Sequence, residues 1–119
     1  MDGRIFQVRK QIIGNLQHQW TIRELAKIAN LSEPHLWRLF KAEIKTSPIA
    51  CVRELRLEKA RELLETTFTH INIIGYEVGI PSGSHFARDF KKKYGMTPTE
   101  YRTQYWEKIQ AEEADDRKG

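Results

Sequence analysis

The sequence repeats at an interval of 50 residues, and this repeat restricts the folds that the chain can adopt. When Phe40 is aligned with Phe90, identical or similar residues match on both sides of the pair. The matched pairs are His35 with His85, Leu36 with Phe86, Arg38 with Arg88, Lys41 with Lys91, Ile44 with Tyr94, and Ser47-Pro48 with Thr97-Pro98. Upstream, the apolar pattern from Ile22 to Leu31 returns from Ile71 to Ile80, with one extra residue in the second turn. The chain therefore contains two structural units of one kind.

Apolar residues recur at helical spacing through both units, and no β pattern competes with them. Thr21 and Glu24 form a capping box, and Ser32 caps the next helix, whose first turn contains Pro34. Asn30 tolerates the left-handed conformation that the turn between these two helices often needs. The expected helices cover 4–17, Thr21 to the turn at Asn30, Ser32 to Ile44, Ser47 to about Leu64, Ile71 to Val78, the end of the turn at 79–82 to Gly95, and Thr97 past Ile109. We predict an all-α fold of seven helices, with one helix-turn-helix in each unit.

The predicted helices divide the chain into two subdomains, residues 4–46 and 70–106, joined by a linker helix at 47–65. Charges of both signs alternate on the polar side of the linker at i,i+3 and i,i+4 spacing, which is typical of a rigid spacer. The residues predicted to face inward along the linker are Ile49, Val52, Leu55, Ala60, Leu63 and Leu64. We assign these parts to one domain, residues 1–106. The last helix is expected to fray into an acidic tail at 107–119.

The charge of the chain indicates a polyanionic partner. The 119 residues carry a net charge of +4, and the acidic tail leaves 17 basic and 11 acidic residues, a net +6, in residues 1–106. No run approaches roughly 18 apolar residues, and no apolar leader opens the chain, so we expect neither a membrane span nor a signal peptide. The lone cysteine, Cys51, rules out an internal disulfide and fits a reducing cytoplasm.

The helix before Gly95 has an apolar stripe of Phe86, Phe90 and Tyr94. A helix this short is not stable alone, so the stripe must hold it to a core and leave the other side exposed. That side carries Ser84, His85, Arg88, Lys91 and Lys92, and its counterpart in the first unit carries Glu33, Pro34, Trp37, Arg38 and Lys41. Small polar and basic faces of this kind suit recognition helices in a DNA major groove. The alternative is a solvated amphipathic helix of some all-α domain.

The sequence carries no pattern typical of a metalloprotein or an enzyme. His18, His35, His85 and Cys51 match no known ligand spacing, and the repeat accounts for the equivalence of His35 and His85. There is no glycine-rich phosphate loop, no nucleophile elbow and no isolated carboxylate pair. We expect no catalytic residue, no metal and no cofactor.

Taken jointly, the motifs resemble the DNA-binding domain of the AraC/XylS family of bacterial transcription regulators, over about residues 4–106. The elements that carry the resemblance are Leu25-Ala26, Leu31-Ser32, Leu36 to Lys41, Ser47-Pro48, the linker pattern Arg56, Ala60, Leu63 and Leu64, the turn Val78-Gly79-Ile80, the polar run Ser82 to His85, the run Phe86 to Lys92, Gly95, Pro98, and Tyr101-Arg102. The resemblance implies a monomeric domain that places two recognition helices in successive major grooves of double-stranded DNA, roughly 34 Å or about 10 bp apart. It also implies a transcription regulator, most often an activator that contacts RNA polymerase. Dimerisation would need a domain outside these residues.

On this basis, base contacts are predicted for Pro34, Trp37, Arg38, Ser84, His85 and Arg88. Arg38 and Arg88 come first, because a guanidinium can bond both O6 and N7 of guanine. For each of them the alternative is a solvated or phosphate-bound side chain. Trp37 either touches a thymine methyl or sugar edge or folds back on the core.

Contacts with the DNA backbone are predicted for Ser32, Lys41, Arg56, Ser82, Lys91, Lys92 and Lys93. Arg56 has a second interpretation, an ion pair with a neighbouring glutamate.

Several positions depart from the family pattern. Asn30 and Lys45 stand where glycines are usual, and Ile80 replaces a phenylalanine. Gly75 replaces an alanine and is expected to weaken its helix by up to about 1 kcal/mol. Gly83 lacks the longer polar side chain of related proteins, which weakens base recognition by the second unit.

Two other functions compete with sequence-specific regulation. One is a helical protein-interaction module that kept the fold without operator binding, which Glu33 and Gly83 favour. The other is a non-specific nucleic-acid binder, which follows from the charge alone. The chain is either a stand-alone regulator or the C-terminal part of a longer one.

Overall fold

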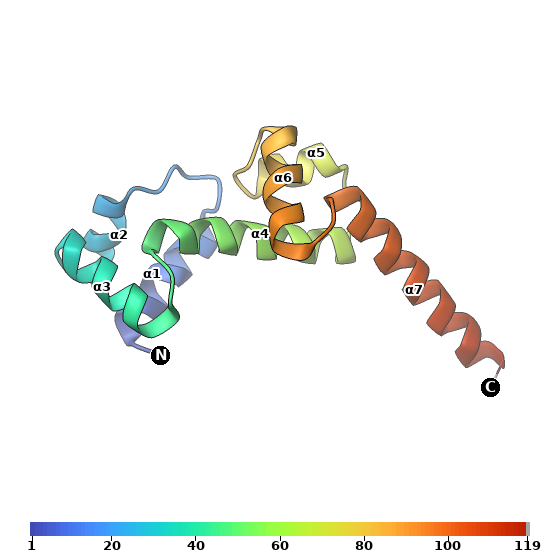
Figure 1. Ribbon diagram of the computed structural model, residues 1–119, viewed down its shortest axis with the longest axis horizontal. Helices are drawn as coiled ribbons and strands as arrows, with labels where there is room; N and C mark the ends of the chain where they lie inside the picture. Colours follow the sequence, from blue (N-terminus) through green and yellow to red (C-terminus); the bar gives the residue numbers. More distant parts are fainter. Residues whose placement is uncertain (119) are drawn as a thin grey trace. The chain divides into compact units, whose positions relative to one another are not determined.

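The computed structural model describes residues 1–118, which contain seven helices and no strand (Figure 1). The helices are α1 (Gly3–Gly14), α2 (Ile22–Ala29), α3 (Glu33–Ile44), α4 (Pro48–Thr66), α5 (Ile71–Glu77), α6 (Gly83–Tyr94) and α7 (Pro98–Lys118). The predicted all-α class and the number of helices are confirmed. None of the helices in this range combines the length and the apolar composition that a membrane-spanning segment requires.

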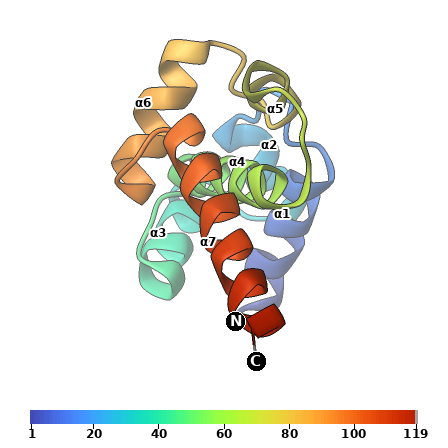
Figure 2. The same ribbon diagram turned by 90° about the vertical axis from the view of Figure 1, so that its right-hand side faces the viewer.

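Two compact units make up the chain, Met1–Glu58 and the residues from Lys59 onward. The division falls inside α4, which continues through it without a break (Figures 1 and 2). The first part of α4 therefore belongs to one unit and the second part to the other.

The first unit has one apolar core, shared by α1, α2, α3 and the start of α4. Its buried residues are Ile5, Val8, Ile12, Leu16, Leu25, Ala26, Ala29, Leu36, Phe40, Cys51, Val52 and Leu55. In α1 the core position is Ile12, whereas the side chain of Ile13 is 54% exposed. Burial raises the pKa of the Cys51 thiol to about 11, so this cysteine behaves as a small apolar core residue.

Local signals in the first unit act as the sequence predicts. The hydroxyl of Thr21 accepts the backbone N–H of Glu24, and the Glu24 carboxylate accepts the N–H of Thr21. Asn30 ends α2 in the left-handed conformation, with φ of 56°. Lys45 ends α3 in the same conformation, with φ of 62°, and its ammonium donates to the carbonyl oxygen of Ala42 at 3.1 Å. This bond satisfies one of the last carbonyls of α3.

Two expectations for the linker helix were wrong. Ile49, predicted to face inward, is 39% exposed, while Leu57, which was not on the predicted inner face, is buried. A single inward-facing stripe was expected along the whole of α4. Instead, the first part of α4 packs into the core of the first unit, and the rest of the helix belongs to the second unit. The helix also ends at Thr66, and the hydroxyls of Thr66 and Thr67 donate to the carbonyl oxygens of Glu62 and Leu63, at 2.7 Å each.

In the second unit an aromatic cluster surrounds Phe90, which is fully buried. Its ring centroid lies 6.0 Å from that of Phe86, 4.7 Å from that of Tyr94 and 5.6 Å from that of Tyr101. Aromatic pairs at these separations stabilise a core beyond the area that they bury. Gly95 ends α6 with φ of 82°, as its position in the sequence predicts.

The expectation that the last helix frays into the tail was wrong. α7 begins at the capping box of Thr97 and Glu100 and remains helical to Lys118. Alanine, glutamine and glutamate dominate its distal part, and Glu113 and Arg117 have the favourable i,i+4 order. These strong helix formers account for the helix although residues 110–117 are exposed.

Gly75 has a packing role that the sequence alone does not reveal. The backbone N–H of Ile80 donates to the Gly75 carbonyl oxygen at 2.7 Å. A Cβ atom at position 75 would lie 2.8 Å from the Ile80 carbonyl oxygen and 2.9 Å from Cδ2 of Phe86. The turn between α5 and α6 therefore approaches α5 so closely that only glycine fits.

We expect Gly75→Ala to lower the free energy of unfolding by about 1–3 kcal/mol, because overpacking outweighs the gain in helix propensity. Gly14→Ala is the matched control, since a Cβ atom there would meet nothing within 4 Å. Urea denaturation followed by circular dichroism measures both. A Gly75→Ala protein as stable as the Gly14→Ala protein would contradict the close approach.

Candidate nucleic-acid interface

The helix α3 is fixed by its inner side and capped at its start. Leu36 and Phe40 are fully buried, and the Ser32 hydroxyl accepts the backbone N–H of His35 at 3.2 Å. Pro34 lies in the first turn, where no hydrogen-bond donor is lost. The opposite side of α3 is left to solvent.

The side chains of Pro34, Trp37, Arg38 and Lys41 are all exposed on α3. Trp37 is 47% exposed, and the ammonium of Lys41 lies 5.2 Å from the centroid of its ring, a cation–π contact. Of the two interpretations of Trp37, the structure therefore supports the surface position. Arg38 forms no hydrogen bond or ion pair with any of the described residues.

The helix α6 is built in the same way. Phe86 and Phe90 are buried, and the Ser82 hydroxyl accepts the backbone N–H of His85 at 3.4 Å. Ser84, His85 and Arg88 are exposed.

Charge on the exposed side of α6 is not evenly distributed. Arg88 is 68% exposed, and its Nε donates to the Asp89 carboxylate at 3.2 Å. Three exposed lysines, Lys91, Lys92 and Lys93, follow in the last turn. Cations at a helix C-terminus interact favourably with the helix dipole, so the lysines stabilise α6 and make its end basic.

Arg56, for which a contact with the DNA backbone was predicted, is engaged within the first unit. Its Nε donates to the carbonyl oxygen of Leu16 at 2.9 Å, and its Nη2 donates to that of His18 at 2.8 Å. Burial lowers the pKa of this guanidinium. The predicted alternative, a glutamate partner, is not formed either. Arg56 instead ties the segment after α1 to α4.

Arg102 has the equivalent role in the second unit, although sequence analysis identified it only as part of a motif. Its guanidinium donates to the carbonyl oxygens of Leu64 at 3.3 Å, Thr67 at 3.1 Å and Thr69 at 2.6 Å. The neighbouring Tyr101 hydroxyl donates to the Glu65 carboxylate. These bonds satisfy carbonyls at and beyond the end of α4, which no helical N–H reaches.

A family model for a helix-turn-helix domain matches residues 25–104. The chain belongs to the AraC/XylS family of helix-turn-helix DNA-binding domains. This confirms the family resemblance.

Two relatives and one solved structure illustrate the similarity. The chain is 33% identical over 101 residues, 85% of its length, to the transcriptional regulator MtrA of Neisseria gonorrhoeae, and 33% identical over 99 residues, 83% of its length, to the transcriptional activator RclR of Escherichia coli K12. A transcriptional regulator from Chromobacterium violaceum superposes with a TM-score of 0.81 at 31% identity, covering 86% of this chain and 91% of that one. The chain spans 34% of MtrA and 35% of RclR, about a third of each.

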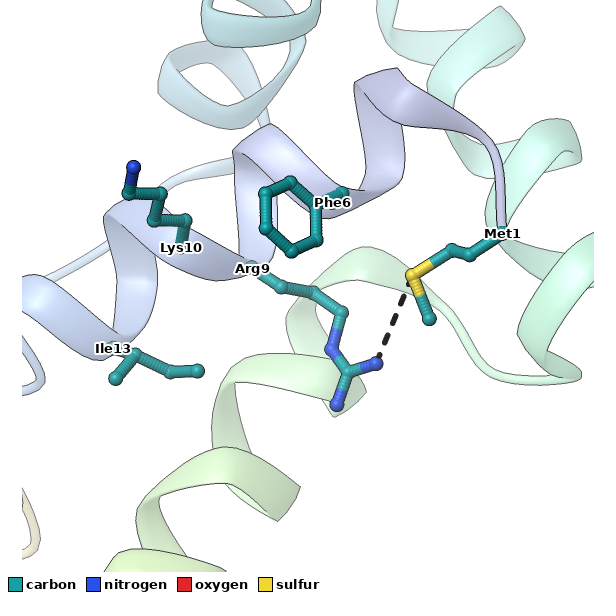
Figure 3. A pocket seen from close by; sticks show the side chains of 5 residues that line it. All are labelled: Met1, Phe6, Arg9, Lys10 and Ile13. Carbon is teal, nitrogen blue, oxygen red and sulfur yellow. Dashed lines mark hydrogen bonds between the residues drawn. The ribbon is translucent and has the colours of Figure 1, made fainter.

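A separate groove lies on α1 of this AraC/XylS domain (Figure 3). It has a volume of about 520 Å³ and is lined by Met1, Phe6, Arg9, Lys10 and Ile13. Nη1 of Arg9 lies 3.9 Å from the Met1 sulfur. None of the residues predicted to contact DNA lines the groove.

Within the described residues, no three side chains of the His, Cys, Asp or Glu type are grouped to hold a metal.

We expect Arg56→Met to lower the free energy of unfolding by about 1–3 kcal/mol, because two carbonyl oxygens lose a charged donor while the aliphatic stem is kept. Arg53→Met is the control, since Arg53 is exposed on the same helix and has no bond to any described side chain. Chemical denaturation of the two variants decides the role of Arg56. Equal stabilities would show that its hydrogen bonds do not hold the unit together.

Proposed function

We propose that this domain binds double-stranded DNA in a sequence-dependent way through α3 and α6, and thereby regulates transcription. The observation that carries the proposal is the pair of equivalent, exposed arginines, Arg38 and Arg88, each on a capped helix that two buried side chains anchor. The names of MtrA, a transcriptional regulator, and RclR, a transcriptional activator, support regulation of transcription, and we favour activation.

We further propose that α3 and α6 enter successive major grooves, about 10 bp apart. α4 supports the use of both helices by one domain, because this unbroken helix of 19 residues joins the two units. A covalent connection keeps the second helix at a high effective concentration once the first is bound. The domain then acts as a monomer in the cytoplasm, with RNA polymerase as its protein partner.

The roles of individual side chains follow from their exposure. Arg38 and Arg88 take the base contacts, and the neighbouring exposed residues Pro34, Trp37, Ser84 and His85 supply weaker ones. The backbone phosphates are met by Ser32, Lys41, Ser82, Lys91, Lys92 and Lys93. Arg56 is left out of this set, because its guanidinium is bound to two carbonyl oxygens.

Fluorescence anisotropy tests the proposed function directly. The chain is titrated against a random duplex and against a duplex selected for tight binding, at several salt concentrations. We expect affinity for the selected duplex to be higher by a factor of about 10³ or more, and both affinities to fall with salt. Equal affinities would reduce the function to non-specific binding, and no binding would leave a protein-interaction module.

Alanine substitutions separate base readers from phosphate contacts. We expect Arg38→Ala and Arg88→Ala each to cost about 1–3 kcal/mol on the selected duplex and to relax preference at bases about one turn apart. Lys92→Ala should weaken all duplexes alike and reduce the salt slope by about 1. If both kinds of change act identically on selected and random DNA, the assigned roles are wrong.

A further inference from the structure

The two recognition helices differ along one row of exposed positions. In α3 this row is Glu33, Trp37 and Lys41, at i,i+4 spacing, and the contact between Lys41 and the Trp37 ring shows that these side chains are neighbours. In α6 the corresponding residues are Gly83, Ala87 and Lys91. The first unit therefore presents a carboxylate and an indole where the second presents almost no side chain.

The carboxylate of Glu33 is free to accept hydrogen bonds from a ligand. Glu33 is the first residue of α3 and is exposed, and it has no hydrogen bond or ion pair among the described residues. Lys41, the base in its row, is engaged with the Trp37 ring. An acid in the first turn also stabilises a helix through the dipole, but that interaction leaves the carboxylate oxygens open to solvent.

We propose that Glu33 reads a cytosine, by accepting a hydrogen bond from the N4 amino group in the major groove. This inference rests on the proposed function. Residues at the start of a recognition helix meet base edges, and a carboxylate can only accept. At their major-groove edges, guanine and thymine offer acceptors, and adenine offers its N6 donor beside the acceptor N7. Cytosine alone offers a donor with no acceptor on its own major-groove edge.

The same carboxylate acts against other sequences. Opposite guanine, thymine or a phosphate, the Glu33 carboxylate gives up its bound water molecules and meets no hydrogen-bond donor in their place. This loss is unfavourable for a charged group. Discrimination of this kind combines an attractive contact with a repulsive one. Glu33 therefore strengthens sequence preference and weakens binding to random DNA.

The test uses the duplex selected for tight binding, with each base pair facing α3 replaced in turn by the other three. Wild type, Glu33→Gln and the control Glu43→Gln are compared by anisotropy; Glu43 is exposed near the other end of α3, and its substitution removes the same charge. We expect wild type and Glu43→Gln to prefer cytosine at one position by about tenfold. Glu33→Gln should lose that preference and favour adenine there, because a glutamine amide can bond N6 and N7 together.

A cytosine preference that survives in Glu33→Gln, or that Glu43→Gln loses equally, overturns the assignment while leaving the proposed function intact. A wild-type protein without preference for any duplex contradicts the proposed function itself, and the inference falls with it. Matching circular dichroism spectra of the three proteins show that none of these results reflects unfolding.

Discussion

Burial of two side chains holds each recognition helix in place, and the exposed chemistry depends on that anchoring. α3 and α6 are 12 residues long, a length at which an isolated helix is marginal in water. Leu36 and Phe40 anchor the first helix, and Phe86 and Phe90 anchor the second. Because the inner side and the start of each helix are fixed, the outward side chains are presented in a constant direction, which recognition of base edges requires.

In both units an arginine ties the end of an earlier helix to a later one, α1 to α4 in the first unit and α4 to α7 in the second. Arg56 bonds carbonyl oxygens just after α1, and Arg102 bonds those at and after the end of α4. The two arginines are not partners in the 50-residue alignment, where Arg102 matches Val52. The units thus share a physical solution, a guanidinium that donates to backbone carbonyl oxygens, and its position in the repeat differs between the units by one helical turn.

Local signals explain why much of the fold could be predicted. Capping at Thr21 and Ser32 and the left-handed Asn30 depend on neighbouring residues only, and all three are as expected. The errors at Ile49 and Gly75 involve contacts between distant residues. Exposure of Ile49 depends on which core each part of α4 joins, and the need for glycine at 75 depends on Phe86 and the turn that precedes it. The helical period alone predicts that the candidate base contacts are exposed. It cannot predict the bonds of Arg56, because their acceptors, Leu16 and His18, lie far away in the sequence.

Selection of bound duplexes from a random library is the most direct test of the proposal that α3 and α6 both read DNA. Site length, half-site spacing and base preference are obtained together. Two clusters of enriched bases, centred about 10 bp apart, are expected when both helices read the major groove. Enrichment of a single cluster, or clusters at variable spacing, would contradict the proposal that α3 and α6 read successive major grooves.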